Sequence, residues 1–206
     1  ACFVNLLEPG DTAIVGANGV FGDRMCEVAR RCGAEVVRIE EEWGRALDPQ
    51  RLLDAQRAHP EARLVAVVHA ETSTGVENDV APLRALQATD TLFVLDTVTS
   101  LGGIPVEIDG WGVDAAYSGT QKCLGVPPGL SPVSFSPRAV ERIRNRAEPA
   151  QSWYLDLGLI AGRDAQLRTK NAARDLDVPA PLEKLELRPV IERRELRAGD
   201  WNVPVQ

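Results

Sequence analysis

The sequence lacks an excess of basic charge and a long apolar run. Its formal net charge is −7, and no basic cluster is interleaved with aromatic residues, which argues against nucleic acid as a partner. No uninterrupted apolar stretch is long enough to cross a bilayer, and the first residues show no basic-then-apolar signal pattern. We therefore expect a cytoplasmic protein that has no membrane partner.

Cysteine is scarce, and its spacing is irregular. The four cysteines, Cys2, Cys26, Cys32 and Cys123, form no C-x-x-C pair and lie in apolar or helical contexts, so they predict reduced, mostly buried thiols. His69 and Glu71 match half of a zinc deaminase signature, but no P-C-x-x-C segment follows them. The sequence therefore predicts no metal site, and His69 is expected either to pack or to lie near a cofactor.

Lysine is rarer still, because 20 of the 23 basic side chains are arginines. One of the three lysines, Lys122, stands in the uncharged segment 117–125, directly after a predicted short strand at Ala115–Ser118. A desolvated lysine can lose its proton and attack a carbonyl, whereas a guanidinium stays protonated. This context favours Lys122 as a residue that forms a Schiff base.

A carboxylate suited to the same chemistry ends the apolar segment Leu92–Asp96, which predicts a buried strand. Pyridoxal phosphate requires a lysine for its aldehyde and an acid for its pyridinium nitrogen, and Lys122 and Asp96 supply both. Spacing alone leaves a second interpretation open, in which Asp96 is an ordinary strand-end aspartate and Lys122 a surface lysine.

Predicted strands and helices alternate along most of the chain. This alternation predicts an α/β fold with a mostly parallel sheet. Leu64–His69 is apolar on both faces over most of its length, as expected of a central strand covered by helices on both sides, which makes a three-layer sandwich. Asp48 and Pro49 form a typical helix start. The expected strands are Thr12–Val15, Glu35–Ile39, Leu64–His69 and Leu92–Asp96, and the expected helices are Asp23–Cys32, Asp48–Ala58 and Pro82–Ala88.

The two ends of the sequence differ from this pattern. Residues 1–7 resemble the middle of an amphipathic helix that ends at Glu8-Pro9-Gly10, so we expect sequence upstream of Ala1. After Gly162 the composition changes: residues 163–206 contain nine basic and eight acidic side chains and one aromatic residue, Trp201. We expect a domain over 1–162 and a divergent, extended or poorly ordered tail over 163–206.

Four motifs occur in a fixed order in the first domain. Together they closely resemble the alanine–glyoxylate and serine–pyruvate aminotransferases of the class V, fold type I group of pyridoxal phosphate enzymes, and the resemblance extends over residues 1–162. It implies the large cofactor domain of that fold, without its first elements and without the small C-terminal domain. The motifs are Val15–Gly22, Glu71–Gly75, Asp96–Gly103 and Ser118–Lys122.

The resemblance also implies roles for individual residues. Lys122 is expected to hold pyridoxal phosphate as an internal aldimine and to act as general base, and Asp96 to keep the pyridine nitrogen protonated. Phe21 replaces the usual stacking tryptophan, and Val98 is expected on the opposite face of the ring, although a plain core valine is an open alternative. The residues expected to bind the phenolic oxygen or the phosphate are Thr72 and Gln121, followed by Ser118 and Thr120.

Other residues of these motifs are expected to be structural. Ser73 and Thr74 are typical turn formers, and Asn18-Gly19 predicts a left-handed turn. The resemblance implies transamination between a small amino acid, alanine or serine, and a 2-oxo acid, glyoxylate or pyruvate, in a homodimeric complete enzyme. The alternatives are a non-catalytic or weakly cofactor-binding fragment and, less favoured, a cysteine desulfurase-like lyase, which usually has histidine where Gln121 stands. The substrate-carboxylate arginine is not identified.

Overall fold

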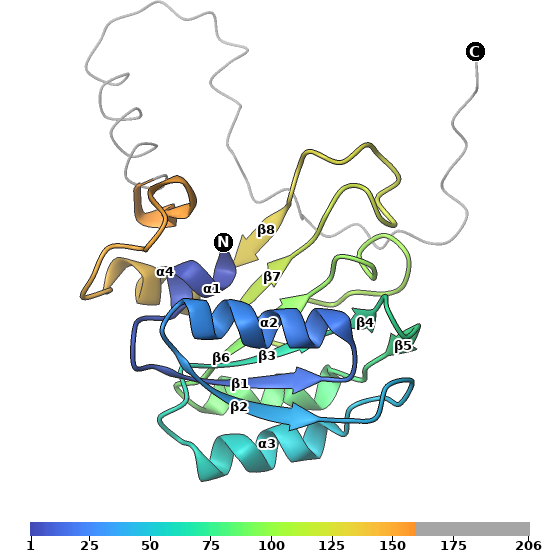
Figure 1. Cartoon of the computed structure of the whole chain (residues 1–206), viewed down its shortest axis with the longest axis horizontal. Helices are drawn as coiled ribbons and strands as arrows, with labels where there is room; N and C mark the ends of the chain where they lie inside the picture. Colours follow the sequence, from blue (N-terminus) through green and yellow to red (C-terminus); the bar gives the residue numbers. More distant parts are fainter. Residues whose placement is uncertain (160–206) are drawn as a thin grey trace, which may run out of the picture. The chain divides into compact units, whose positions relative to one another are not determined.

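A computed structural model describes residues 1–159, so the predicted tail at 163–206 lies outside the described residues. The described chain contains a six-stranded sheet in the order β2–β1–β3–β6–β7–β8 (Figure 1). Neighbouring strands from β2 to β7 are parallel, and only the β7–β8 pair is antiparallel. The strands are β1 Thr12–Ala17, β2 Glu35–Glu40, β3 Leu64–Val68, β6 Leu92–Asp96, β7 Ala115–Tyr117 and β8 Val133–Phe135.

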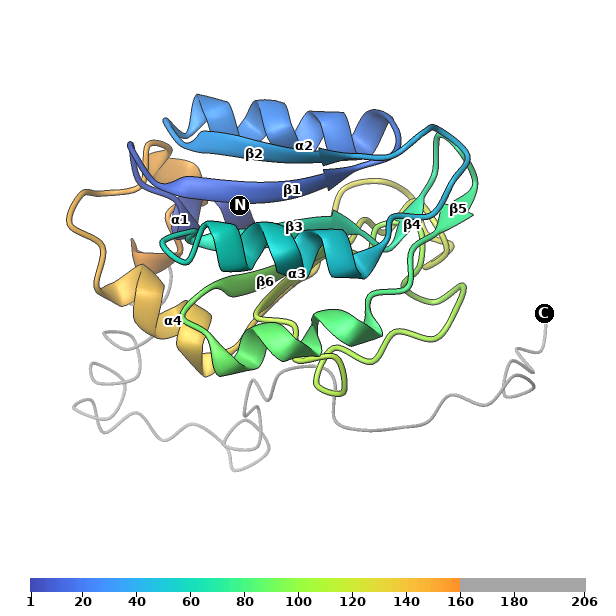
Figure 2. The same cartoon turned by 90° about the horizontal axis from the view of Figure 1, so that it is seen from below.

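Helices cover both faces of this sheet, as Figures 1 and 2 show for α2 and α3. Side chains of β1 alternate between two cores: Ala13 and Val15 pack with α1, α2 and α4, and Ile14 packs with α3 and η1. The expected three-layer α/β sandwich is therefore confirmed. The helices are α1 Cys2–Leu6, α2 Val20–Arg31, α3 Pro49–Ala58, α4 Pro137–Arg144 and the 3₁₀ helices η1 Ala81–Ala88 and η2 Trp153–Leu155.

The predicted elements all form: the strand Leu92–Asp96 has its predicted bounds, and the other elements have shifted ends. Strand β3 is buried along its whole length between β1 and β6, as its apolar sequence predicted. Helix α3 begins as expected, because the Asp48 side chain accepts a hydrogen bond of 2.8 Å from the Gln50 N–H. The Pro82–Ala88 segment is helical but of the 3₁₀ type. Helix α2 begins three residues before the predicted start at Asp23.

Several elements were not predicted. The hairpin of β4 (Ala70–Glu71) and β5 (Val76–Glu77) is too short to leave a pattern of alternation. Helix α4 carried a recognisable start signal, since Ser136 caps it and Pro137 occupies its first turn.

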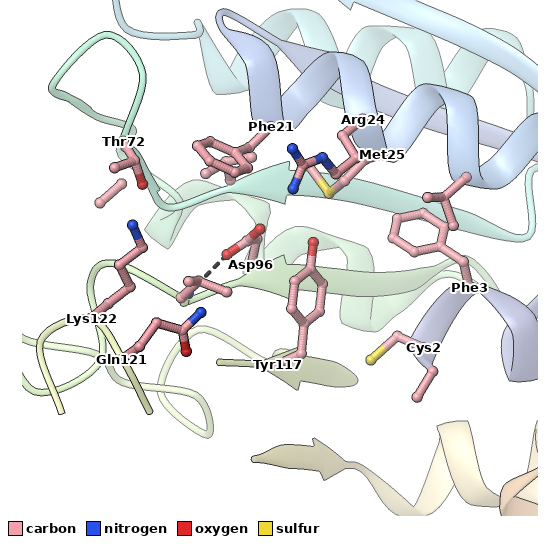
Figure 3. Close-up of a pocket in the computed structure, with 15 residues that line it drawn as sticks. Cys2, Phe3, Phe21, Arg24, Met25, Thr72, Asp96, Tyr117, Gln121 and Lys122 are labelled. Carbon is pink, nitrogen blue, oxygen red and sulfur yellow. Dashed lines mark hydrogen bonds between the residues drawn. The ribbon is translucent and has the colours of Figure 1, made fainter. Parts of the chain in front are cut away.

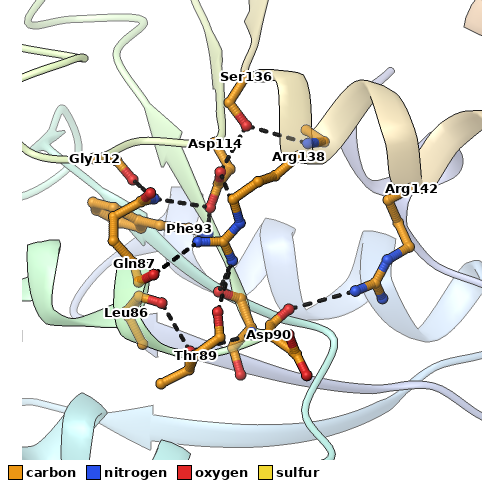
Figure 4. Close-up of polar contacts among 12 residues, drawn as sticks. Leu86, Gln87, Thr89, Asp90, Phe93, Gly112, Asp114, Ser136, Arg138 and Arg142 are labelled. Atoms are coloured by element: carbon orange, nitrogen blue, oxygen red, sulfur yellow. Dashed lines mark hydrogen bonds and ion pairs between the residues drawn. The ribbon is translucent and has the colours of Figure 1, made fainter.

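A buried carboxylate, Asp114, joins α4 to the sheet at the amino end of β7 (Figure 4). It accepts hydrogen bonds from the Phe93 N–H at 3.0 Å and from the Ser136 hydroxyl at 2.7 Å. Arg138 of α4 lies 3.8 Å from the same carboxylate and donates to the Thr89 carbonyl at 2.9 Å. These bonds stabilise the end of the sheet opposite the carboxyl end of β6.

The described residues also test the sequence interpretation of the cysteines. Cys2, Cys26 and Cys32 are buried free thiols, whereas Cys123 is exposed. Burial raises the pKa of the Cys2 thiol to about 11, which keeps this thiol protonated near neutral pH.

None of the helices described over residues 1–159 is both long and apolar enough to span a bilayer.

Candidate functional site

A pocket of about 510 Å³ opens at the carboxyl end of the parallel strands. Asp96 ends β6, Tyr117 ends β7, and α2 contributes Phe21 and Arg24 to its wall (Figure 3). This edge is where ligands bind in open α/β sheets, and the volume lies in the usual range for small-molecule sites. The lining residues are Ala1, Cys2, Phe3, Phe21, Arg24, Met25, Val28, Val68, Ala70, Thr72, Asp96, Val98, Tyr117, Gln121 and Lys122.

The pocket brings together most of the residues that the sequence nominated. Two do not line it: the Ser118 hydroxyl donates to the Thr97 carbonyl at 3.2 Å, and the Thr120 hydroxyl donates to the Pro127 carbonyl at 2.9 Å. Both residues are buried. Their hydroxyls support the loop that follows β7, and their expected role at a phosphate stays a prediction. The nominated residues that do line the pocket are Phe21, Thr72, Asp96, Val98, Gln121 and Lys122.

Asp96 is the buried carboxylate of the pocket, and its side chain is held in place. It is 6% exposed, and one carboxylate oxygen accepts a hydrogen bond of 2.8 Å from the Val98 N–H. Burial raises the pKa of Asp96, and the hydrogen bonds from the Val98 backbone and from Tyr117 only partly oppose this effect. A cation placed against Asp96 in the pocket would favour the ionised carboxylate.

Lys122 lies in the turn after β7, and its side chain points toward Thr72 (Figure 3). The sequence context predicted a desolvated amine, but Lys122 and the neighbouring Gln121 are exposed. The reason is local: residues 121–133 are all exposed, so the apolar neighbours of the lysine in sequence do not fold over it. The prediction that Lys122 is desolvated is therefore wrong for the described chain, although the lysine does reach the pocket.

The wall opposite this loop consists of Phe21 and its neighbours. The guanidinium carbon of Arg24 lies 5.0 Å from the centroid of the Phe21 ring, a cation–π contact. Thr72 also lines the pocket, and its hydroxyl forms a short hydrogen bond with the Thr99 hydroxyl. The ring of Phe21 and the hydroxyl of Thr72 thus present one apolar and one polar surface to the same cavity.

The remaining nominated residues are structural in this fold. His69 is 2% exposed and packs edge-on against Trp111 at 5.0 Å between ring centroids, and it does not line the pocket. Burial lowers its pKa, which favours the neutral imidazole. The predicted left-handed turn at Asn18-Gly19 is wrong, since Gly19 has an extended φ of 174° and no described residue other than glycine has a positive φ.

Three residues of the site were not assigned a role from sequence. Tyr117 was placed in a strand, but only the pairing of β7 with β6, which sets Tyr117 opposite Asp96, reveals that it faces the pocket. Arg24 lies on the predicted helix without a distinguishing pattern. Glu71, beside the pocket, was named only as part of a motif and of the half zinc signature, and its contact with α2 joins residues about 50 positions apart. Among residues 1–159, no group of three or more His, Cys, Asp or Glu side chains is arranged to hold a metal ion.

Comparison with known proteins matches the aminotransferase class-V family model to residues 1–150. An alanine–glyoxylate aminotransferase from Drosophila melanogaster is 41% identical over 162 residues, which cover 78% of this chain and 41% of that protein. A crystal structure of an alanine–glyoxylate aminotransferase from Nostoc sp. superposes with a TM-score of 0.75 at 42% identity, covering 78% of this chain and 42% of the other. A ureidoglycine–glyoxylate aminotransferase from Bacillus subtilis superposes with a TM-score of 0.78 at 36% identity, covering 81% and 43%.

Proposed function

Because this chain belongs to the aminotransferase class-V family, we propose that it supplies the cofactor-binding site of a transaminase that uses pyridoxal phosphate. Its fold is that of the large domain of fold type I aminotransferases. The chain spans about two fifths of the length of the relatives it matches. The observation that carries the proposal is the convergence of Asp96 and Lys122 on one pocket at the carboxyl end of the sheet.

The residues of the pocket fit this cofactor chemically. Asp96 is a buried carboxylate with a raised pKa, and no ion pair with a basic side chain is recorded for it among the described residues. A protonated pyridine nitrogen is a cation of suitable size for such a site. Phe21 and Val98 provide apolar surface for a flat ring, and Lys122 provides the amine that an aldehyde requires.

Bound pyridoxal phosphate supplies an electron sink for the pair released when the Cα–H bond of an amino acid breaks. In the proposed mechanism Asp96 would hold the proton on the pyridine nitrogen, and this would maintain that sink. The Lys122 amine Nζ would hold the cofactor through its aldehyde, and the same amine would be the base that accepts the proton from the substrate Cα. The hydrogen bond from Val98 N–H fixes the Asp96 carboxylate for this role.

For substrates we propose a small amino acid, alanine or serine, as donor and a small 2-oxo acid, glyoxylate or pyruvate, as acceptor. Support comes from the names of the relatives, two of which are called alanine–glyoxylate aminotransferases and one ureidoglycine–glyoxylate aminotransferase. We further propose that the complete enzyme is a homodimer. Gln121 stands before Lys122, where a cysteine desulfurase would carry histidine, so a lyase is the weaker enzymatic alternative.

The exposure of Lys122 favours one other function, a fragment that binds the cofactor weakly or not at all. Titrating the purified 206-residue chain with pyridoxal phosphate and following the absorbance of the bound form separates the two. Borohydride reduction and mass mapping then locate the pyridoxyl group. The proposal expects the label on Lys122. A label found mainly on Lys170 or Lys184, or no saturable binding, would overturn it.

A further inference from the structure

Glu71 is buried beside the pocket but does not line it. It is 1% exposed, and its carboxylate accepts hydrogen bonds from the backbone N–H groups of Phe21 and Gly22, both at 3.2 Å. It also accepts from the Ser73 N–H at 3.2 Å and from the Ser73 hydroxyl at 2.6 Å. The donors are neutral, and no ion pair of Glu71 is recorded among the described residues.

The hydrogen bonds from the Phe21 and Gly22 N–H groups make Glu71, a residue of β4, the cap of helix α2. The first N–H groups of a helix have no partner within it, and the helix dipole favours negative charge there. The residue at the N-cap position, Gly19, has no side chain that could accept hydrogen bonds from these N–H groups. Glu71, from β4, takes the place of that missing cap. The carboxylate is thus stabilised by the helix terminus and the β4–β5 turn.

The close approach requires glycine at position 19. A Cβ atom there would lie 2.5 Å from both Cγ and Cδ of Glu71 and 2.6 Å from the Ser73 hydroxyl oxygen. Since φ of Gly19 is extended, the requirement is for space and not for an unusual backbone conformation. The chain therefore leaves room at the start of α2 for this one carboxylate.

The position of Glu71 links two residues that line the pocket. Phe21, whose N–H it binds, carries the ring proposed to stack on the cofactor, and Thr72, the next residue after Glu71, lines the same pocket. We propose that Glu71 is a positioning residue that fixes the Phe21 ring relative to Thr72. The inference rests on the proposed function, because the ring acts only through a bound cofactor.

A second consequence follows from the charge of Glu71. The exposed N–H groups at a helix start are a common binding site for phosphate. With the Glu71 carboxylate already bound to the Phe21 and Gly22 N–H groups, these donors are occupied and the local charge is negative. A phosphate would therefore find neither free backbone donors at Phe21 and Gly22 nor a favourable charge at the start of α2.

Glu71→Gln in the 206-residue chain tests the inference, because it keeps the shape but replaces one acceptor oxygen with a donor. Without cofactor, hydrogen exchange at the Phe21 and Gly22 amides should accelerate at least tenfold. With pyridoxal phosphate, the dissociation constant should rise at least tenfold, and the circular dichroism band of the bound cofactor should change shape. Ser73→Ala, which removes one donor and no charge, should produce a smaller change in the same direction.

Asp114→Asn is the matched control, since Asp114 is a buried carboxylate that caps backbone and side-chain donors at the other end of the sheet. It should lower the melting temperature without changing the cofactor band or the two amides. If Glu71→Gln does not fold, Glu71→Asp and Ser73→Ala carry the test. Wild-type affinity and band shape in the Glu71 variants would overturn the inference. If the wild-type chain does not bind pyridoxal phosphate, the proposed function is overturned instead. In that case, exchange at the Phe21 and Gly22 amides that is unchanged in Glu71→Gln would still refute the role of Glu71.

Discussion

Asp96 and Tyr117 lie directly opposite each other in the parallel pairing of β6 with β7, and both side chains line the pocket. Burial and the nearby carboxylate raise the pKa of Tyr117 well above its ordinary value, so the phenol stays neutral. A neutral phenol can donate a hydrogen bond to Asp96, and this bond lowers the pKa of the carboxyl group. The pair therefore keeps a buried acid in place without adding a second charge.

The raised pKa of Asp96 predicts that Asp96→Asn stabilises the cofactor-free chain near neutral pH. A carboxyl group whose pKa is higher in the folded state favours folding when protonated, and it loses that contribution as the pH rises from the ordinary aspartate value through the folded value. Asparagine does not titrate. The gain should be on the order of 1 kcal/mol and should shrink in acid. Denaturant unfolding at several pH values measures it, and a variant less stable at neutral pH would contradict the prediction.

The same substitution, Asp96→Asn, should lower catalytic turnover although it stabilises the cofactor-free chain. In a complete enzyme containing this domain, Asp96→Asn keeps the acceptor for the Val98 N–H but removes the charge proposed to hold a proton on the pyridine nitrogen. Turnover should fall by orders of magnitude, about 10²-fold or more, while bound cofactor remains detectable. Single-turnover kinetics with alanine and glyoxylate provide the measurement. Unchanged turnover would remove Asp96 from the mechanism.

Much of the sheet could be predicted from the sequence because its signals are local. The apolar segments at Leu64–Val68 and Leu92–Asp96 and the helix start at Asp48-Pro49 each depend on neighbouring residues alone. The start of α2 could not be predicted in this way. It lies at Val20 because Glu71, some 50 residues away in sequence, caps the N–H groups of Phe21 and Gly22.

The candidate site shows the same division between features that local sequence predicts and features that depend on tertiary contacts. Asp96 and Lys122 were identified from residue type and motif, and both reach the pocket. The exposure of Lys122 depends on how the loop that follows it packs, which no local pattern encodes. Tyr117 became visible as a pocket residue only through the register of β6 and β7. Residue chemistry was thus predictable, whereas the surroundings of each residue required the tertiary structure.

Gly19→Ala should destabilise the chain although alanine usually favours folding over glycine. The added methyl group would lie 2.5 Å from two carbon atoms of the buried Glu71 side chain, so Glu71 or the start of α2 must move. Overpacking of this kind costs about 1–3 kcal/mol. Denaturant unfolding should show this loss. Val20→Ala, at the adjacent exposed residue, is the control and should change stability by less than about 0.5 kcal/mol. A stabilised Gly19→Ala variant would show that the close approach is not required.

Phe21→Trp should tighten the binding of pyridoxal phosphate. The larger indole ring offers more surface for stacking on a pyridine ring, and aromatic pairs contribute about 0.5–1.5 kcal/mol beyond the area they bury, which corresponds to a two- to tenfold lower dissociation constant. The Arg24 guanidinium that lies over the present ring should also interact well with an indole.

Phe21→Leu is the matched variant, because it keeps apolar volume but removes the aromatic face. Its dissociation constant should exceed that of the wild type, so that affinity follows the order Trp, Phe, Leu at position 21. Fluorescence titration with pyridoxal phosphate measures all three. Arg24→Met separates the two contributions, since it leaves the Phe21 ring in place while removing the cation above it. If the three side chains at position 21 bind the cofactor equally, the ring of Phe21 does not stack on it, and the proposed orientation of the cofactor in this pocket is wrong.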